Sequence, residues 1–91
     1  MSAKTMKQAA MISAWIEANP RRPEVEQARI KGTGIPVWAL VGYLDAVLGD
    51  PARVAEDYGL PLEAVNAALA YYAQHRAAID TRLAANAASV S

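Results

Sequence analysis

The side chains of this 91-residue chain that could take part in catalysis are few and poorly spaced for it. Its single histidine, His75, has Asp80 five positions later, which puts the two side chains about 140° apart on a helix of 3.6 residues per turn. Glu56 and Asp57 are adjacent, so on a helix they diverge and do not form a two-carboxylate site. We therefore expect His75 to be an ordinary helix-surface histidine and the protein not to be an enzyme.

Metal and cofactor chemistry lack their usual sequence signals as well. The chain has no cysteine and no spaced set of histidine and carboxylate residues, which excludes zinc fingers, iron-sulfur clusters and cysteine nucleophiles. The Gly32-Thr33-Gly34 stretch lacks the further glycine and the Lys-Ser/Thr pair of phosphate-binding loops. We expect it to be a turn, and we expect no metal and no cofactor.

Length and composition predict one compact domain. Hydrophobic residues make up 54% of the chain and charged residues 20%, which excludes a disordered protein. A chain of this size buries only about 60 to 65% of its unfolded surface, so dimerisation would extend a modest core. No apolar run is long enough for a signal peptide or a membrane span, and the lack of cysteine suits a reducing compartment. We expect a cytoplasmic protein without membrane contact.

The charges balance in number but not in position. The chain has nine basic and nine acidic residues, yet basic residues are in excess up to Lys31 and acidic residues are in excess beyond it. This asymmetry favours two partners of opposite charge, although chance clustering on a solvated surface explains it equally well. Without an overall basic excess, composition alone does not indicate nucleic-acid binding.

The first two segments of the chain are an N-terminal helix extension (residues 1–19) and a connector with a β-hairpin (residues 20–36). Ile12, Trp15 and Ile16 recur at helical spacing and predict a helix over residues 3–18 that Asn19-Pro20 ends. Residues 27–37 carry β-branched side chains on both sides of the glycine turn and predict two short strands. Such a hairpin is marginal alone, so pairing of residues 28–30 with another chain predicts a homodimer.

The third segment, residues 37–91, reads as a helical helix-turn-helix domain with a helical tail. An apolar stripe predicts one helix up to Gly49; its members are Val37, Leu40, Val41, Leu44, Val47 and Leu48. Asp50-Pro51 opens a short helix to about Tyr58, and a last helix runs from Pro61 past Ala84. The predicted fold class is mainly α: an N-terminal helix, a short β-hairpin and a three-helix helix-turn-helix core with a long C-terminal helix.

The short helix, the turn at Gly59 and the following helix together are typical of a DNA-binding helix-turn-helix. If the second helix reads DNA, its outward face is Glu63, Asn66, Ala67 and Ala70. Asn66 suits adenine and an alanine suits a thymine methyl, but no arginine is placed for guanine. The cations expected to contact phosphates are Arg21, Arg22, Arg29, Lys31 and Arg53.

Two tryptophans and two arginines are candidates for protein contacts. Trp15 and Trp38 are most simply core residues, and the alternative is a contact between chains, where amphipathic aromatic residues are favoured. Arg76 and Arg82 lie in the alanine-rich tail from Gln74 onward, whose apolar stripe thins toward the end. We expect this tail to fray without a partner, so that truncation beyond residue 77 leaves the fold nearly intact.

Two stretches, RIKGTGIPVWALVGYL and DPARVAEDYGLPLEAVNAALAYYAQH, closely resemble the bacterial family called domain of unknown function 433. The resemblance covers residues 29–75 and implies an antitoxin of a type II toxin-antitoxin pair. Such a protein forms a homodimer, represses its own operon by binding operator DNA and neutralises a PIN-like ribonuclease toxin. It also suggests that Arg76 or Arg82 enters the acidic metal-binding pocket of that toxin.

The sequence departs from the family at two places, and an alternative function stays open. Gly34 stands where many members have arginine, and the N-terminal helix lies outside the resemblance. The alternative is a protein-interaction or oligomerisation module of the same fold that does not bind DNA. The balanced charge and the alanines at positions 67 and 70 favour it.

Overall fold

The computed structural model describes the backbone of residues 3–90 and the side chains of residues 6–87. Its elements are α1 (Ala3–Trp15), β1 (Ile16–Glu17), the 3-10 helix η1 (Val25–Gln27), β2 (Arg29–Ile30), α2 (Val37–Ala46), α3 (Pro51–Tyr58), α4 (Leu62–Gln74) and α5 (Arg76–Val90). The predicted fold class, a mainly helical chain with a short hairpin and a helix-turn-helix, is confirmed. No helix in the described part is both long and apolar enough to cross a membrane.

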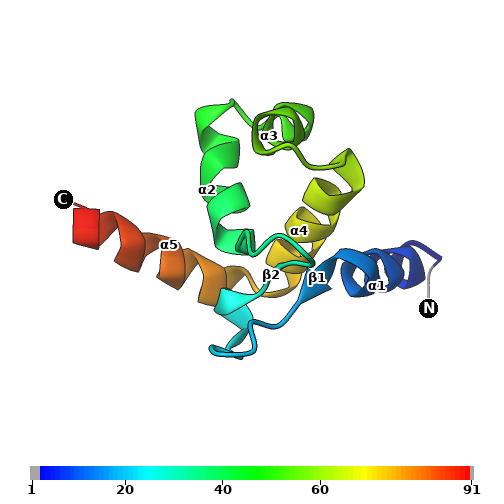
Figure 1. Ribbon diagram of the computed structural model, residues 1–91, viewed down its shortest axis with the longest axis horizontal. Helices are drawn as coiled ribbons and strands as arrows, with labels where there is room; N and C mark the ends of the chain where they lie inside the picture. Colours follow the sequence, from blue (N-terminus) through cyan, green and yellow to red (C-terminus); the bar gives the residue numbers. More distant parts are fainter. Residues whose placement is uncertain (1–2, 91) are drawn as a thin grey trace.

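The central element of the fold is α4, which packs against α1, α2 and α3. In Figure 1 it lies in the middle of the molecule, with α2 and α3 to one side, α1 to the other, and α5 projecting toward the C-terminus. Five elements supply the largest fully buried side chains, which are Ile30, Val37, Leu40, Val54, Val65 and Ile79. The chain therefore folds around one shared core.

The N-terminal helix ends three residues earlier than its sequence predicts. Ile16 leaves the helix after Trp15 and pairs with Ile30, while Glu17 pairs with Arg29 in a two-stranded antiparallel sheet. Ile16 is β-branched and 8% exposed, so an extended backbone that packs it on the core is preferred to another helical turn.

The predicted glycine turn is present, but the predicted strand that follows it is only an isolated β-bridge. Arg29 bridges to Pro36, and the Val37 amide donates to the carbonyl of Ala28 at 2.9 Å. On its other edge β2 pairs with β1, and the Lys31 amide donates to the Trp15 carbonyl at 2.8 Å. Both edges of residues 28–30 are thus occupied within one chain, so the predicted pairing of this strand with another chain is wrong.

The first helix of the helix-turn-helix, α3, begins and ends at the residues predicted from the sequence. Asp50 caps α3 by accepting a hydrogen bond from the Ala52 amide at 3.0 Å, and Pro51 takes the first helical position. Gly59 ends α3 with a φ of 67°, the left-handed conformation that glycine adopts without strain. The prediction fails just before this motif, because α2 ends at Ala46 and Leu48 lies 96% exposed rather than in the apolar stripe.

The single long C-terminal helix of the prediction is in fact two helices, α4 and α5. At His75 the backbone departs from helical geometry, and its amide donates to the carbonyls of Tyr71 and Tyr72. The break lets α5 pack against α2 and η1, with Ile79 fully buried. The expectation that residues beyond 77 are dispensable is therefore wrong, because removing them would take Ile79 out of the core.

Candidate functional site

Half of the predicted DNA-reading face of α4 is covered. Glu63 and Asn66 are exposed, as predicted, but Ala67 is fully buried and Ala70 is 9% exposed. The additional helix α1 packs against α4, which also contacts α2 and α3. The prediction that Ala67 and Ala70 face outward is wrong, and neither alanine can reach a thymine methyl.

Three of the predicted phosphate-binding cations are engaged within the chain. The Arg29 Nε lies 2.7 Å from the Glu17 carboxylate, and the Lys31 Nζ donates to the Ser13 carbonyl at 2.6 Å. Arg53 pairs with Asp57 at 3.0 Å. The remaining two, Arg21 and Arg22, are exposed on the connector.

The structure does not bring the exposed arginines and the exposed end of α4 together. The connector lies at the C-terminal end of α4, where the Tyr71 hydroxyl donates to the Val25 carbonyl at 2.7 Å. Glu63 and Asn66 lie in the N-terminal half of that helix. The predicted DNA-binding residues therefore do not form one continuous surface.

A polar cluster joins α2 to α3. The Tyr43 hydroxyl and the Arg53 guanidinium both donate to the Asp57 carboxylate. The hydrogen bond from Tyr43, and secondly Arg53, lowers the pKa of Asp57, while the same bond raises the pKa of Tyr43. Tyr43 also meets Tyr58 edge to face, with ring centroids 5.3 Å apart. This cluster fixes the position of the two aromatic rings.

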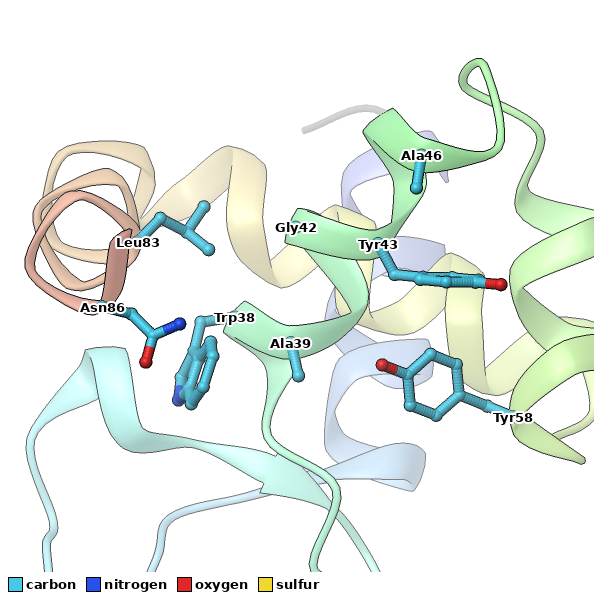
Figure 2. Close-up of a pocket in the computed structure, with 8 residues that line it drawn as sticks. All are labelled: Trp38, Ala39, Gly42, Tyr43, Ala46, Tyr58, Leu83 and Asn86. Atoms are coloured by element: carbon cyan, nitrogen blue, oxygen red, sulfur yellow. The ribbon is translucent and has the colours of Figure 1, made fainter. Parts of the chain in front are cut away.

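Beside these rings lies an apolar groove of about 350 Å³, formed by α2, α3 and α5 and drawn in Figure 2. Its lining residues are Trp38, Ala39, Gly42, Tyr43, Ala46, Tyr58, Leu83 and Asn86. The residues of α2 form the floor, with Tyr58 on one side and Leu83 and Asn86 on the other. We call this site the α2–α3–α5 groove.

At Gly42, in the floor of the groove, α5 approaches α2 closely. A Cβ atom at Gly42 would lie 3.2 Å from the Leu83 Cδ2, which is tighter than ordinary van der Waals contact. Ala39 and Ala46 keep the rest of the floor low. The groove is therefore shallow enough for side chains of another protein segment to contact the α2 helix.

The two predicted partner-binding arginines both stack on rings of their own chain. The Arg76 guanidinium lies 5.3 Å from the centroid of the Tyr72 ring, and that of Arg82 lies 5.0 Å from Trp38. The Arg82 Nε is buried and has no hydrogen-bond partner in the part of the chain with described side chains. Arg82 thus puts a positive charge beside the Trp38 end of the groove.

The two tryptophans have different surroundings. Trp38 is partly buried and lines the groove, whereas Trp15 packs against the core next to β1 and is not among the groove residues. Of the eight residues that line the groove, the sequence analysis named only Trp38 as a binding candidate. The i, i+3 and i+7 spacing of Ala39, Gly42 and Ala46 was a usable signal, but the opposite wall depends on the break at His75.

His75 and Asp80 each contact an aromatic side chain of α4. His75 stacks on Tyr71 with ring centroids 4.5 Å apart, and Asp80 accepts a hydrogen bond from the Tyr72 hydroxyl at 2.7 Å. Within residues 3–90, no three side chains of His, Cys, Asp or Glu are grouped so as to hold a metal ion.

Comparison with known proteins identifies the family. The family described as "Protein of unknown function (DUF433)" matches residues 25–72, which is more than half of the chain. No curated protein and no solved structure matches. The matched region runs from η1 into α4 and leaves out α1 and α5. The chain therefore belongs to the DUF433 family of proteins of unknown function.

Proposed function

We propose that this protein is an interaction module that binds another protein segment in the α2–α3–α5 groove. The observation that carries the proposal is the groove itself, which combines an apolar floor with aromatic rings and the charge of Arg82 at one end. Aromatic residues and arginine are the side chains that contribute most at protein interfaces. This role corresponds to the interaction module that the sequence left open.

The cover over α4 argues against DNA reading as the primary role. A recognition helix has to enter the major groove of DNA with several side chains free to meet base edges. On α4 the flanking alanines are buried, and three of the nearby cations already have partners in the chain. Transfer of Arg29, Lys31 or Arg53 to phosphate would break those contacts.

A second candidate is the antitoxin-like regulator that the family resemblance implies, with operator DNA and a PIN-like ribonuclease as partners in the cytoplasm. One observation favours it: α3, the Gly59 turn and α4 keep the order of a helix-turn-helix, and Asn66 on α4 is exposed. If the protein is such a regulator, the ribonuclease is the protein that the α2–α3–α5 groove binds.

Fluorescence anisotropy of labelled DNA separates the two candidates. We expect the protein to bind the DNA upstream of its own gene only non-specifically, with a dissociation constant above about 1 µM at physiological salt. This dissociation constant should be the same for wild type and Asn66→Ala. Phosphate contacts by Arg29 and Lys31 predict instead that replacing both with alanine flattens the salt dependence by about two units. Tight binding that Asn66→Ala weakens or redirects would contradict the proposal.

The groove is tested by filling it. Ala46 is exposed and lines the groove, so Ala46→Arg introduces bulk and charge there without disturbing the core. We expect Ala46→Arg to prevent complex formation, measured by light scattering of the protein alone and mixed with a PIN-like ribonuclease encoded beside it. Asn66→Ala is the control that retains binding. Equal association of both variants would rule out the groove.

A further inference from the structure

Leu48 is the one non-glycine residue in the described part of the chain with a positive φ, 58°. It is also 96% exposed. A left-handed backbone is unfavourable for leucine, and an exposed leucine gains no burial in return. The turn between α2 and α3 thus holds an apolar side chain out into solvent at a cost to the isolated chain.

Acidic residues flank Leu48 in the sequence, and Arg53, which lines a small hollow together with Leu48, is paired with Asp57. Asp45 and Asp50 are exposed on either side of Leu48 in the sequence. The groove is apolar, and beside its Trp38 end lies Arg82, with its buried Nε unpaired within the described side chains. The Leu48 side chain, with Asp45 and Asp50 beside it in the sequence, is therefore complementary to an apolar groove that has Arg82 at one end.

We infer that the occupant of the groove is Leu48 of a second copy of this chain, in a two-fold dimer whose α2 helices pack antiparallel. The inference rests on the proposed function, namely that the groove binds protein. Small residues at Ala39, Gly42 and Ala46 allow the two helices to approach. Because an isologous contact is used twice, the assembly closes at two copies.

The spacing along α2 fits this arrangement. If the two helices cross near Gly42, Trp38 lies about 6 Å from the crossing point at 1.5 Å per residue. On the opposite side α2 ends at Ala46, also about 6 Å from the crossing point, and Leu48 follows in the turn beyond it. Antiparallel packing then puts Leu48 of one copy at the Trp38 end of the other copy's groove. Asp45 lies about 4.5 Å from the crossing point on the same side as Leu48, which brings it toward Arg82 of the second copy.

Sedimentation equilibrium tests the dimer. We expect wild type to associate to a dimer and no further between about 1 and 200 µM, the range of ordinary micromolar affinities. Leu48→Asn should raise the dissociation constant about a hundredfold or more, because the dimer buries two copies of this side chain and burial of each leucine is worth about tenfold. Leu62→Asn is the matched control, since Leu62 is also exposed, at 43%, but lies on α4. A monomeric wild type, or equal weakening by both substitutions, would overturn the inference.

A charge exchange tests the orientation. Asp45→Arg and Arg82→Glu should each weaken the dimer, and the double variant should regain most of the lost affinity. Additive losses would overturn the antiparallel arrangement. A monomeric wild type leaves the proposed function to be decided separately, by whether Ala46→Arg abolishes binding of the PIN-like ribonuclease. A dimer that Ala46→Arg leaves intact would overturn the inference.

Discussion

The backbone at Leu48 gives a stability prediction that does not depend on the dimer. Asparagine adopts the left-handed conformation more readily than leucine, and the 96% exposed leucine side chain contributes little burial. In an Ala46→Arg background, Leu48→Asn should raise the free energy of unfolding by about 0.5 to 1 kcal/mol, measured with urea. Leu62→Asn should give no such gain. A loss of stability at position 48 would show that the side chain is supported within the chain.

The Tyr43–Asp57–Arg53 cluster makes stability depend on pH on the acid side. The folded chain lowers the pKa of Asp57 below its ordinary 3.8, chiefly through the Tyr43 hydroxyl. Its stabilising contribution is therefore present above that value and is lost as pH falls through the lower pKa of the folded state. Asp57→Asn should show a smaller decrease in Tm than wild type between about pH 5 and pH 2.

Glu24 offers the control for this experiment, because it is also an exposed carboxylate and makes no ion pair among the described residues. Glu24→Gln should follow the wild-type acid profile. Identical profiles for wild type and Asp57→Asn would mean that the hydrogen bond from Tyr43 does not favour the charged carboxylate in solution.

At the scale of elements, α5 is the helix whose role the prediction missed. Ile79 is fully buried, so Ile79→Ala should lower the free energy of unfolding by about 2 to 5 kcal/mol. Ala84 is exposed on the same helix, and Ala84→Ser should change stability by less than about 0.5 kcal/mol. Urea unfolding of both variants measures the difference. Equal stabilities would mean that α5 is not docked on the core.

Local signals were enough for the helix-turn-helix and its boundaries. Asp50, Pro51 and Gly59 act through their own backbone and nearest neighbours, so their positions predict where α3 begins and ends. The end of α1 and the break at His75 are decided by distant contacts instead. Ile16 pairs with Ile30, and Ile79 packs in the core beside α2. Helical periodicity does not predict either contact.

The candidate site was only partly predictable for the same reason. Trp38 was predicted as a partner-binding candidate from its residue type, and Arg82 from its place in the alanine-rich tail and from the family resemblance. Their stacking, and the groove beside them, exist only because α5 turns back toward α2. Conversely, helical periodicity placed Ala67 outside, since the sequence does not indicate that α1 covers α4.

At the scale of the whole molecule, the additional helix and the ion pairs shift the balance from DNA toward protein contact. α1 packs against α4, while β1 carries Glu17 to neutralise Arg29. The basic excess of the N-terminal third is thereby partly satisfied inside the chain. The α2–α3–α5 groove, in contrast, stays open and is lined by residues of α2, α3 and α5.

The emission of Trp38 tests protein contact at this groove most directly. The chain has two tryptophans, so Trp15→Phe leaves Trp38 as the only reporter, and it lines the groove. We predict that its emission maximum moves to shorter wavelength as protein concentration rises from about 1 to 200 µM, because association removes water from the indole. The same variant carrying Ala46→Arg should show no shift. Emission that stays constant while sedimentation records association would contradict the account.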